Sequence, residues 1–290
     1  MIPFFFHYTI ALTIRKSPDK IAAMTKTAYA STIKRHKLED FEPMRKAGRL
    51  VATALDEVTP MIKEGTTTLT IDKFFMEFAA DHKILPATLN YRGYRHACCT
   101  SINHVVCHGI PNDKPLREGE IVNIDVTFIV DGWHGDSSRM YGVGEIPRSA
   151  ERLIEVTYEC LMRGVAMVKP GAHLGDIGFA IQQYAERERC SVVRDFCGHG
   201  IGQIFHDQPN VLHYGRMGDG VELKPGMFFT IEPMINLGKP HVKVLSDNWT
   251  AVTRDRSLSA QFEHMVAVTE TGCEIFTLSP KGLHCPPYKI

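Results

Sequence analysis

The chain has 290 residues, which is enough for one large domain or two small ones with a sizeable core. It is 44% hydrophobic and 23% charged, as expected of an ordinary globular protein. Its 33 basic and 33 acidic residues balance, so no basic excess favours nucleic acid or an anionic membrane as a partner.

The N-terminal residues 2–14 are largely apolar, but this run is too short to span a bilayer. We expect residues 1–36 to form a poorly ordered N-terminal extension. Two alternatives stay open, namely a signal peptide cleaved after residues 28–30 and a translation start at Met24. No basic residue precedes the apolar run and His7 interrupts it, which argues against the signal peptide.

Apolar periodicity predicts paired helices in each half of the remaining chain. The first helix of each pair stops at a glycine. Runs of β-branched and aromatic residues predict strands between and after the helices. The predicted helices cover residues 41–63, 69–83, 150–168 and 174–189, and the clearest strands cover residues 121–130, 227–231 and 259–266.

The sequence repeats itself. The segment 61–65 (Met-Ile-Lys-Glu-Gly) recurs as 167–171 (Met-Val-Lys-Pro-Gly), and 116–125 recurs as 223–232. The second repeated segment ends in an acid in both copies. Two copies of a long α/β unit predict two halves packed about a pseudo-twofold axis, not a solenoid. We therefore expect a single domain over residues 37–290, with pseudo-symmetric halves 37–145 and 146–290.

Two of the acids converge if the first repeated strand forms a tight hairpin. Asp131-Gly132 is a strong signal for a two-residue turn. That turn places Asp136 opposite Thr127, which shares a strand face with Asp125 because side chains alternate. Asp125 and Asp136 are then diagonal neighbours on one face.

The second half places two more acids near this pair. Pseudo-symmetry predicts Glu232 near Asp125, and Glu263 near Asp136. Four carboxylates at such short range repel one another, and bound cations relieve the repulsion. Two divalent ions balance four negative charges, and oxygen ligands with one imidazole suit manganese, iron(II), cobalt or zinc. His199, in a glycine-rich segment, is the natural imidazole.

A more ordinary reading applies to each of these residues alone. A single acid on a strand is more often a surface or turn residue, and a single His-Gly pair carries little information. Acids inside apolar strands, at matching places of a duplicated unit, are hard to explain by folding alone.

Five ordered motifs resemble the type I methionine aminopeptidases from about Lys37 to the C-terminus. These are Asn123-Ile124-Asp125, His134-Gly135-Asp136-Ser137-Ser138, Gly198-His199-Gly200-Ile201-Gly202, Thr230-Ile231-Glu232-Pro233-Met234 and Gln261-Phe262-Glu263-His264. The resemblance implies the pita-bread fold, an α/β (α+β) domain whose curved antiparallel sheet is flanked by helices. It also implies two metals, the first held by Asp125, Asp136 and Glu263. The second is held by Asp136, His199, Glu232 and Glu263.

The resemblance extends to the substrate site. It implies that Glu232 acts as general base while His108 and His206 bind the substrate and assist catalysis. Residues matching the methionine pocket of the family are Tyr91, Tyr94, Cys99, Phe205 and Trp249. Ordinary core packing is the alternative for each of these five. Thr88 and His104 stand where some relatives have other residues, which leaves the shape of the pocket and the charge of its rim open.

The activity implied is removal of the initiator methionine from nascent polypeptides with a small second residue, through attack by water activated between two metals. Expected partners are nascent N-termini, at the ribosome, without direct contact to nucleic acid or membrane, for a monomer. Eight cysteines without a C-x-x-C pair argue against a zinc ribbon and favour a reducing compartment, hence the cytoplasm. Two rivals share the fold: a prolidase or aminopeptidase P, which normally carries a large extra N-terminal domain, and a binding protein that has lost its metal ligands.

Overall fold

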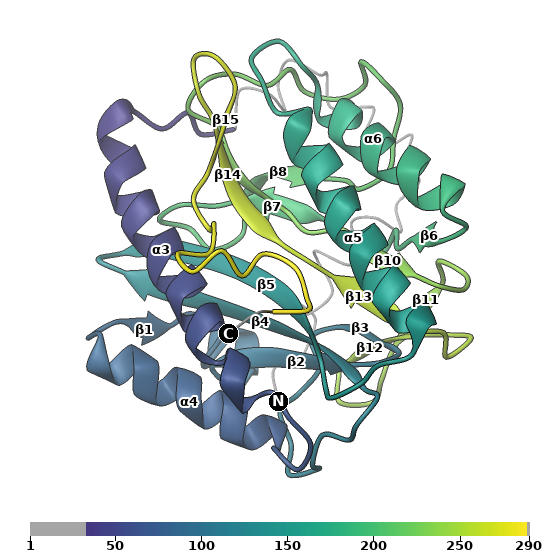
Figure 1. Cartoon of the computed structure of the whole chain (residues 1–290). Coiled ribbons are helices and arrows are strands. Elements are labelled where there is room, and N and C mark those ends of the chain that lie inside the picture. The colour runs from purple at the N-terminus through teal and green to yellow at the C-terminus, as the bar shows by residue number, and fades with distance from the viewer. Residues whose placement is uncertain (1–32, 289–290) are drawn as a thin grey trace, which may run out of the picture.

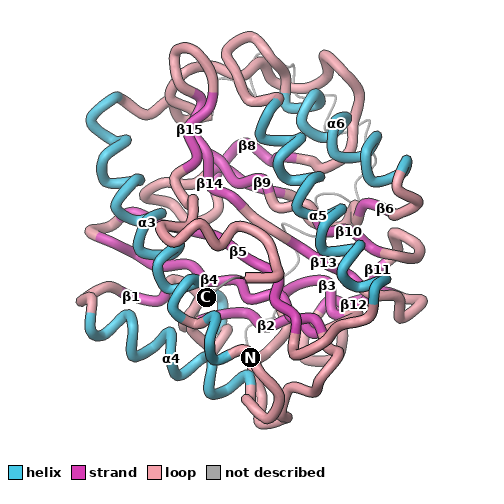
Figure 2. Tube along the Cα trace, in the orientation of Figure 1, coloured by secondary structure: helices cyan, strands magenta, loops and turns pink. Residues whose placement is uncertain are grey.

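The computed structural model describes residues 33–288 as helices packed on antiparallel sheets (Figures 1 and 2). The mixed α/β class is therefore confirmed. The predicted disorder of the extension, its alternatives and His7 concern residues 1–32, which lie outside the described part.

The first half carries two long helices and five strands. In chain order its elements are η1 (Leu38–Asp40), α3 (Phe41–Glu57), η2 (Thr59–Met61), α4 (Thr68–Asp81), β1 (Leu85–Pro86), η3 (Tyr91–Gly93), β2 (Cys98–Ile102), β3 (Val105–Cys107), β4 (Ile121–Val130) and β5 (Trp133–Gly142).

The second half again begins with two long helices. Its elements are α5 (Arg148–Ala166), α6 (Leu174–Arg187), β6 (Ser191–Val192), β7 (Gly198–Gly200), β8 (Asp207–Val211), β9 (Phe228–Ile231), β10 (Met234–Asn236), β11 (Val242–Val244), β12 (Ala251–Thr253), β13 (Ser259–Gln261), β14 (His264–Val268) and β15 (Cys273–Ile275).

All four predicted helices form, and the first is shorter than expected. We predicted one helix over 41–63, but α3 ends at Glu57 and a short 3-10 turn follows. Pro60 lies in that turn; it lacks an amide hydrogen and its ring clashes with the preceding helical turn, so the α-helix stops before it. The next helix, α4, is capped by Thr67, whose side chain accepts a hydrogen bond from the amide of Thr70 at 3.2 Å.

The helices cover one face of the strands. α3 packs on β4 and β5, α4 on β1 and β2, and α5 on α6 and on β9, β10 and β13. Figure 1 shows the C-terminal segment passing between α3 and α5 on this covered side. On β4, the side chains of Val122, Ile124, Val126 and Phe128 belong to the core beneath α3 and α4, as predicted. The alternate residues of β4, which include Asp125 and Thr127, face the other way.

The two halves repeat one another in their hydrogen bonds. The amide of Gly65 donates to the carbonyl of Leu116 at 2.9 Å, and the amide of Gly171 donates to Leu223 at 3.0 Å. These are the repeated segments that the sequence pairs. Hence the duplication seen in the sequence is a duplication of structure.

Each half has its own hydrophobic core, and each core receives residues from the other half. Ile121 and Met140 of the first half pack into the second core, while Phe228 and Met265 pack into the first. The halves are thus tied together, although the division at 145/146 stays a prediction.

The last residues of the predicted extension are packed against the second half. Ile33 is buried in the second core, and the His36 ring stacks on Phe228 with ring centroids 4.2 Å apart. The amide of His36 donates to Gly226 at 2.7 Å. Ordered packing therefore begins before residue 37. No helix within residues 33–288 is long and apolar enough to cross a membrane.

Candidate metal centre and active site

The β4–β5 hairpin has the predicted register. Asp131 and Gly132 both have positive φ, at 49° and 84°, as a tight two-residue hairpin turn requires. Thr127 lies opposite Asp136, and Asp125 lies opposite Ser138. Asp125 and Asp136 are therefore diagonal neighbours on the face that α3 does not cover.

A second antiparallel ribbon carries the other two acids. β9 pairs with β14 and β10 pairs with β13, in one continuous register. Both sides of the ribbon are interrupted at its middle, at residues 232–233 and 262–263. The single strand predicted over 259–266 was therefore wrong in detail. Pro233 has no amide hydrogen for a ladder bond. On the opposite side, the backbone of Glu263 bonds to β5 instead.

The bonds of Glu263 to β5 place it beside the β4–β5 hairpin. The amide of Glu263 donates to the carbonyl of Ser138 at 3.0 Å, and the Ser137 hydroxyl donates to the carbonyl of Glu263 at 2.7 Å. The interruption of the ribbon thus turns Glu263 toward Asp136, as the pseudo-symmetry predicted.

Asp136, His199 and Glu263 meet in a buried cluster. Each offers one ligand atom, and these atoms all lie within 4.8 Å of one another. Nε2 of His199 is 3.6 Å from a carboxylate oxygen of Asp136 and 3.7 Å from one of Glu232. Asp125 lies beside this group, because it is the diagonal neighbour of Asp136 on the same face of the β4–β5 hairpin.

Three polar side chains that the sequence analysis did not assign to the site hold these acids in place. The Thr127 hydroxyl donates to Asp136 at 2.7 Å. The Thr230 hydroxyl donates to Glu232 at 2.8 Å and accepts the amide of His199 at 3.0 Å. The side-chain amide of Gln261 donates to Glu232 at 3.3 Å. Thr127 lies opposite Asp136, and Thr230 and Gln261 each lie two residues from an acid along the chain. Because side chains two residues apart share a strand face, strand alternation was the signal that could have predicted these three residues.

His199 presents one particular nitrogen to the carboxylates. Its Nδ1 lies 3.1 Å from the carbonyl of Gly200, a hydrogen bond in which Nδ1 is the donor. Nε2 is therefore left for the carboxylate side. Burial lowers the pKa of His199, but Asp136 and Glu232 outweigh burial and raise it to about 9. Without a metal, a proton on Nε2 takes the place of a cation.

Burial and mutual repulsion raise the pKa values of the neighbouring carboxyl groups. The pKa of Glu232 rises to about 7, through burial first and then the charge of Asp136, against the opposing charge of His199. The pKa values of Asp125 and Glu263 lie well above normal for the same two reasons. Carboxyl groups that ionise reluctantly without a counter-charge are stabilised in their ionised form by a bound cation.

The donor set fits divalent metal. Four carboxylates and one imidazole nitrogen converge, and the imidazole is oriented through its other nitrogen, as in metal-ligating histidines generally. Asp136 and Glu232 also accept side-chain hydrogen bonds, and backbone pairing holds Asp125 in β4 and Glu263 beside β5. The geometry supports the predicted metal centre, while the number and identity of the ions remain predictions.

Aromatic rings lie beside the acid cluster, next to His199. The ring of His206 lies 4.3 Å from that of His199 and 4.0 Å from that of Phe205, centroid to centroid. Tyr91 lies 5.0 Å from Phe205 and 5.2 Å from His206. The Phe205 ring also stacks on His134 at 5.4 Å. Segments around residues 91 and 205, far apart in sequence, thus form one wall.

A second wall joins the remaining predicted residues. The Tyr94 ring lies 5.0 Å from Trp249, which lies 6.3 Å from His108. Cys99 is buried and pairs directly with Asp125 across β2 and β4. The structure therefore brings together all five predicted pocket residues and both histidines around the acids.

His108 and His206, the two histidines predicted to bind substrate, are neutral at physiological pH. Burial lowers the pKa of His108 to about 4. Burial and then the charge of His199 lower the pKa of His206 to about 2. His108 also has a positive φ of 56°, a backbone conformation that is uncommon outside glycine and is found at functional sites. Each imidazole is thus able to donate one hydrogen bond and accept another.

Comparison with known proteins places this arrangement in a family. Residues 42–270 match the model of metallopeptidase family M24. The methionine aminopeptidase of Rickettsia prowazekii is 58% identical over 259 residues, which are 89% of this chain and 100% of that protein. The chain belongs to the methionine aminopeptidases of metallopeptidase family M24. It is therefore a hydrolase of a family that uses divalent metal.

Solved structures agree with that membership. The crystal structure of the methionine aminopeptidase from Rickettsia prowazekii superposes with a TM-score of 0.84 at 57% identity, covering 85% of this chain and 100% of that one. The prolidase from Pyrococcus horikoshii superposes with a TM-score of 0.66 at 18% identity, covering 90% of this chain and 71% of that one. The second likeness shows the fold alone. The pita-bread fold of the methionine aminopeptidases is thus confirmed.

One buried residue behind the site was not anticipated. His213, in the segment between β8 and β9, has no solvent exposure, and its Nε2 accepts the backbone amide of Glu232 at 3.1 Å. Burial lowers the pKa of His213 to about 3, so it stays neutral as an acceptor. Nothing in its local sequence signals this long-range contact.

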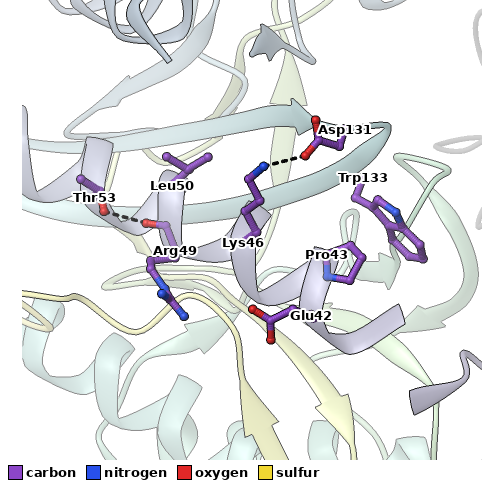
Figure 3. Close-up of a pocket in the computed structure, with 8 residues that line it drawn as sticks. All are labelled: Glu42, Pro43, Lys46, Arg49, Leu50, Thr53, Asp131 and Trp133. Atoms are coloured by element: carbon purple, nitrogen blue, oxygen red, sulfur yellow. Dashed lines mark hydrogen bonds and ion pairs between the residues drawn. The ribbon is translucent and has the colours of Figure 1, made fainter. Parts of the chain in front are cut away.

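A surface groove between α3 and the β4–β5 turn lies apart from the acid cluster. Its lining residues are Glu42, Pro43, Lys46, Arg49, Leu50, Thr53, Asp131 and Trp133 (Figure 3). Lys46 and Asp131 form an ion pair across it at 2.7 Å. None of the predicted metal or substrate residues lines this groove.

Proposed function

We propose that this chain removes the N-terminal methionine from nascent polypeptides by hydrolysis at a centre of two divalent metals. The observation that carries the proposal is the convergence of Asp125, Asp136, His199, Glu232 and Glu263 beside a ring of aromatic side chains. The family supports the reaction, and the donor set supports the metals.

Asp125, Asp136 and Glu263 would hold one metal, and Asp136, His199, Glu232 and Glu263 would hold the other. Cobalt, manganese, iron(II) and zinc all suit this donor set. When bound, divalent metal polarises a carbonyl and lowers the pKa of water, which makes water nucleophilic near neutral pH.

Glu232 acts as the general base. Thr230 and Gln261 donate hydrogen bonds to its two oxygens and so orient the carboxylate for proton transfer. His206 donates a hydrogen bond to the oxygen of the scissile carbonyl as negative charge develops there. His108 contacts the amide nitrogen of the scissile bond and assists its departure.

Methionine enters the pocket formed by Tyr91, Tyr94, Cys99, Phe205 and Trp249. A pocket lined by polarisable aromatic rings and a thiol suits the unbranched thioether side chain of methionine. Burial raises the pKa of Cys99, so it stays a neutral thiol in this wall. The second residue of the substrate is small, in line with the preference that the family resemblance implies.

The setting proposed for this activity is the cytoplasm, where nascent chains emerge from the ribosome. All eight cysteines are unpaired, which suits a reducing compartment. The enzyme is proposed to act as a monomer.

Peptide assays test the function directly. The purified chain, reconstituted in turn with manganese, cobalt, iron(II) and zinc, should release methionine from Met-Ala-Ser and nothing from dipeptides that end in proline. Metal analysis of the protein as purified accompanies the assay. Absence of methionine release with every metal would overturn the enzymatic reading, and proline-dipeptide cleavage would favour a prolidase.

A further inference from the structure

The turn at residues 90–94 holds a basic side chain at the rim of the site. Asn90 and Arg92 have positive φ, at 66° and 49°, although neither is glycine. The turn is fixed by backbone hydrogen bonds, from Tyr91 to Thr88 at 3.0 Å and from Tyr94 to Tyr91 at 2.9 Å. Such a backbone is costly for an arginine and persists only where the surroundings enforce it.

Arg92 reaches the aromatic wall of the site. Its guanidinium lies 5.2 Å from the centroid of the Tyr91 ring, and that ring contacts both Phe205 and His206. The positive charge of Arg92 is one of those that lower the pKa of His206. Stacking on Tyr91 limits the freedom of the guanidinium and so reduces the entropy lost when it binds a ligand.

The charge of Arg92 has no carboxylate partner within residues 33–288. The arginine ion pairs of that region involve Arg45, Arg139, Arg148, Arg152, Arg163 and Arg187. The side chain is also exposed, whereas Tyr94 and Cys99 at the inner end of the pocket are buried. Burial thus decreases from Cys99 toward Arg92, which marks the mouth of the site.

We propose that Arg92 binds a carboxylate on the part of the substrate that follows the scissile bond. This rests on the proposed function. The methionine side chain occupies the buried end, so the rest of the peptide must leave through the open side, past His206 and Arg92. A carboxylate on the leaving part then meets an arginine that nothing else neutralises. It comes either from an acidic side chain at the third position or from the C-terminus of a short peptide.

The expected preference is modest because the pair is exposed. Exposed ion pairs account for roughly two- to five-fold differences in binding. High salt should reduce the preference, since the screening length falls to about 3 Å at 1 M salt.

Paired peptides that differ only in charge test this inference. Wild type, Arg92→Gln, Arg92→Glu and the control Arg95→Gln are assayed as full chains with the same added metal. The peptides are Met-Ala-Asp-amide against Met-Ala-Asn-amide, and Met-Ala-Ser against Met-Ala-Ser-amide. The readout is the ratio of kcat/KM within each pair, which cancels any general loss of activity. Arg95 is an exposed cation three residues further along.

The Asp/Asn ratio should fall roughly two- to five-fold in Arg92→Gln, fall further in Arg92→Glu, and keep its wild-type value in Arg95→Gln. The ratio of kcat/KM for Met-Ala-Ser to that for Met-Ala-Ser-amide reports whether Arg92 also binds the C-terminal carboxylate of a short peptide. Ratios unchanged in both Arg92 variants, or shifted equally in Arg95→Gln, overturn the inference. Failure of the proposed function is distinct, because wild type would then release methionine from no peptide.

Discussion

At the scale of single residues, the site works through carboxyl groups that the fold makes reluctant to ionise. Glu232 is the clearest case, because its pKa of about 7 results from burial and from neighbouring acids. Its side chain is also restrained by Thr230 and Gln261. These two hydrogen bonds orient the carboxylate for proton transfer, which is why they matter for turnover.

Replacing Glu232 with glutamine should remove the base and keep the shape. We expect Glu232→Gln to lower kcat by about 10²- to 10⁴-fold. The metal-free variant should be at least as stable as wild type, because one of the repelling acids is gone. Peptide kinetics and thermal melting check both points, with Glu222→Gln as the control, since Glu222 is exposed on the approach to β9. Wild-type rates in Glu232→Gln would remove it from the role of base.

At the scale of elements, the site depends on how closely α3 presses against β5. Gly135 precedes Asp136 on β5, and a Cβ atom built at this glycine would collide with the carbonyl of Ala47 on α3. Only a residue without a side chain permits this approach. Packing on the covered face therefore positions an acid on the other face.

A methyl group at residue 135 should disturb both stability and metal binding. Gly135→Ala is expected to lower the free energy of unfolding by about 1–3 kcal/mol, because helix backbone rather than a flexible side chain must move. Metal affinity should fall with it, since Asp136 moves too. Denaturant melts and metal titrations measure the two effects. Gly272→Ala is the matched control, because a Cβ there meets nothing within 4 Å; equal stability of both variants would contradict the argument.

At the scale of the whole molecule, stability, pH and metal are linked through the acid cluster. Between pH 4.5 and about 7, the folded chain keeps a proton on Glu232 that the unfolded chain has lost. The unfolding free energy of the metal-free protein therefore falls as pH rises through this window. Asp125 and Glu263, whose pKa values are also raised, act in the same direction.

Metal should stabilise the protein more at pH 7.5 than at pH 5.5, because it must displace these protons and the proton on His199. The measurement is the shift in Tm between manganese and a chelator at each pH. The buried histidines with depressed pKa values, such as His108 and His213, destabilise the fold at low pH with or without metal. Their effect therefore cancels in the difference in Tm between manganese and chelator at the same pH. Asp136→Asn should abolish the shift. An equal shift at both pH values would refute the linkage.

Local sequence rules alone determined much of this protein. Apolar periodicity located both pairs of helices, and Asp131-Gly132 with strand alternation predicted the register that pairs Thr127 with Asp136. Those features depend on neighbours in the chain, on periodicity and on turn chemistry, which a sequence displays directly.

Only the tertiary structure decided the rest. The interruption of the second ribbon on the side of Glu263 follows from its bonds to β5, which no local pattern encodes. The contact of His213 with the amide of Glu232 and the raised pKa of Glu232 likewise arise from segments distant in the chain. Burial and mutual repulsion depend on which side chains share a volume, and that is known only when the two halves are packed together.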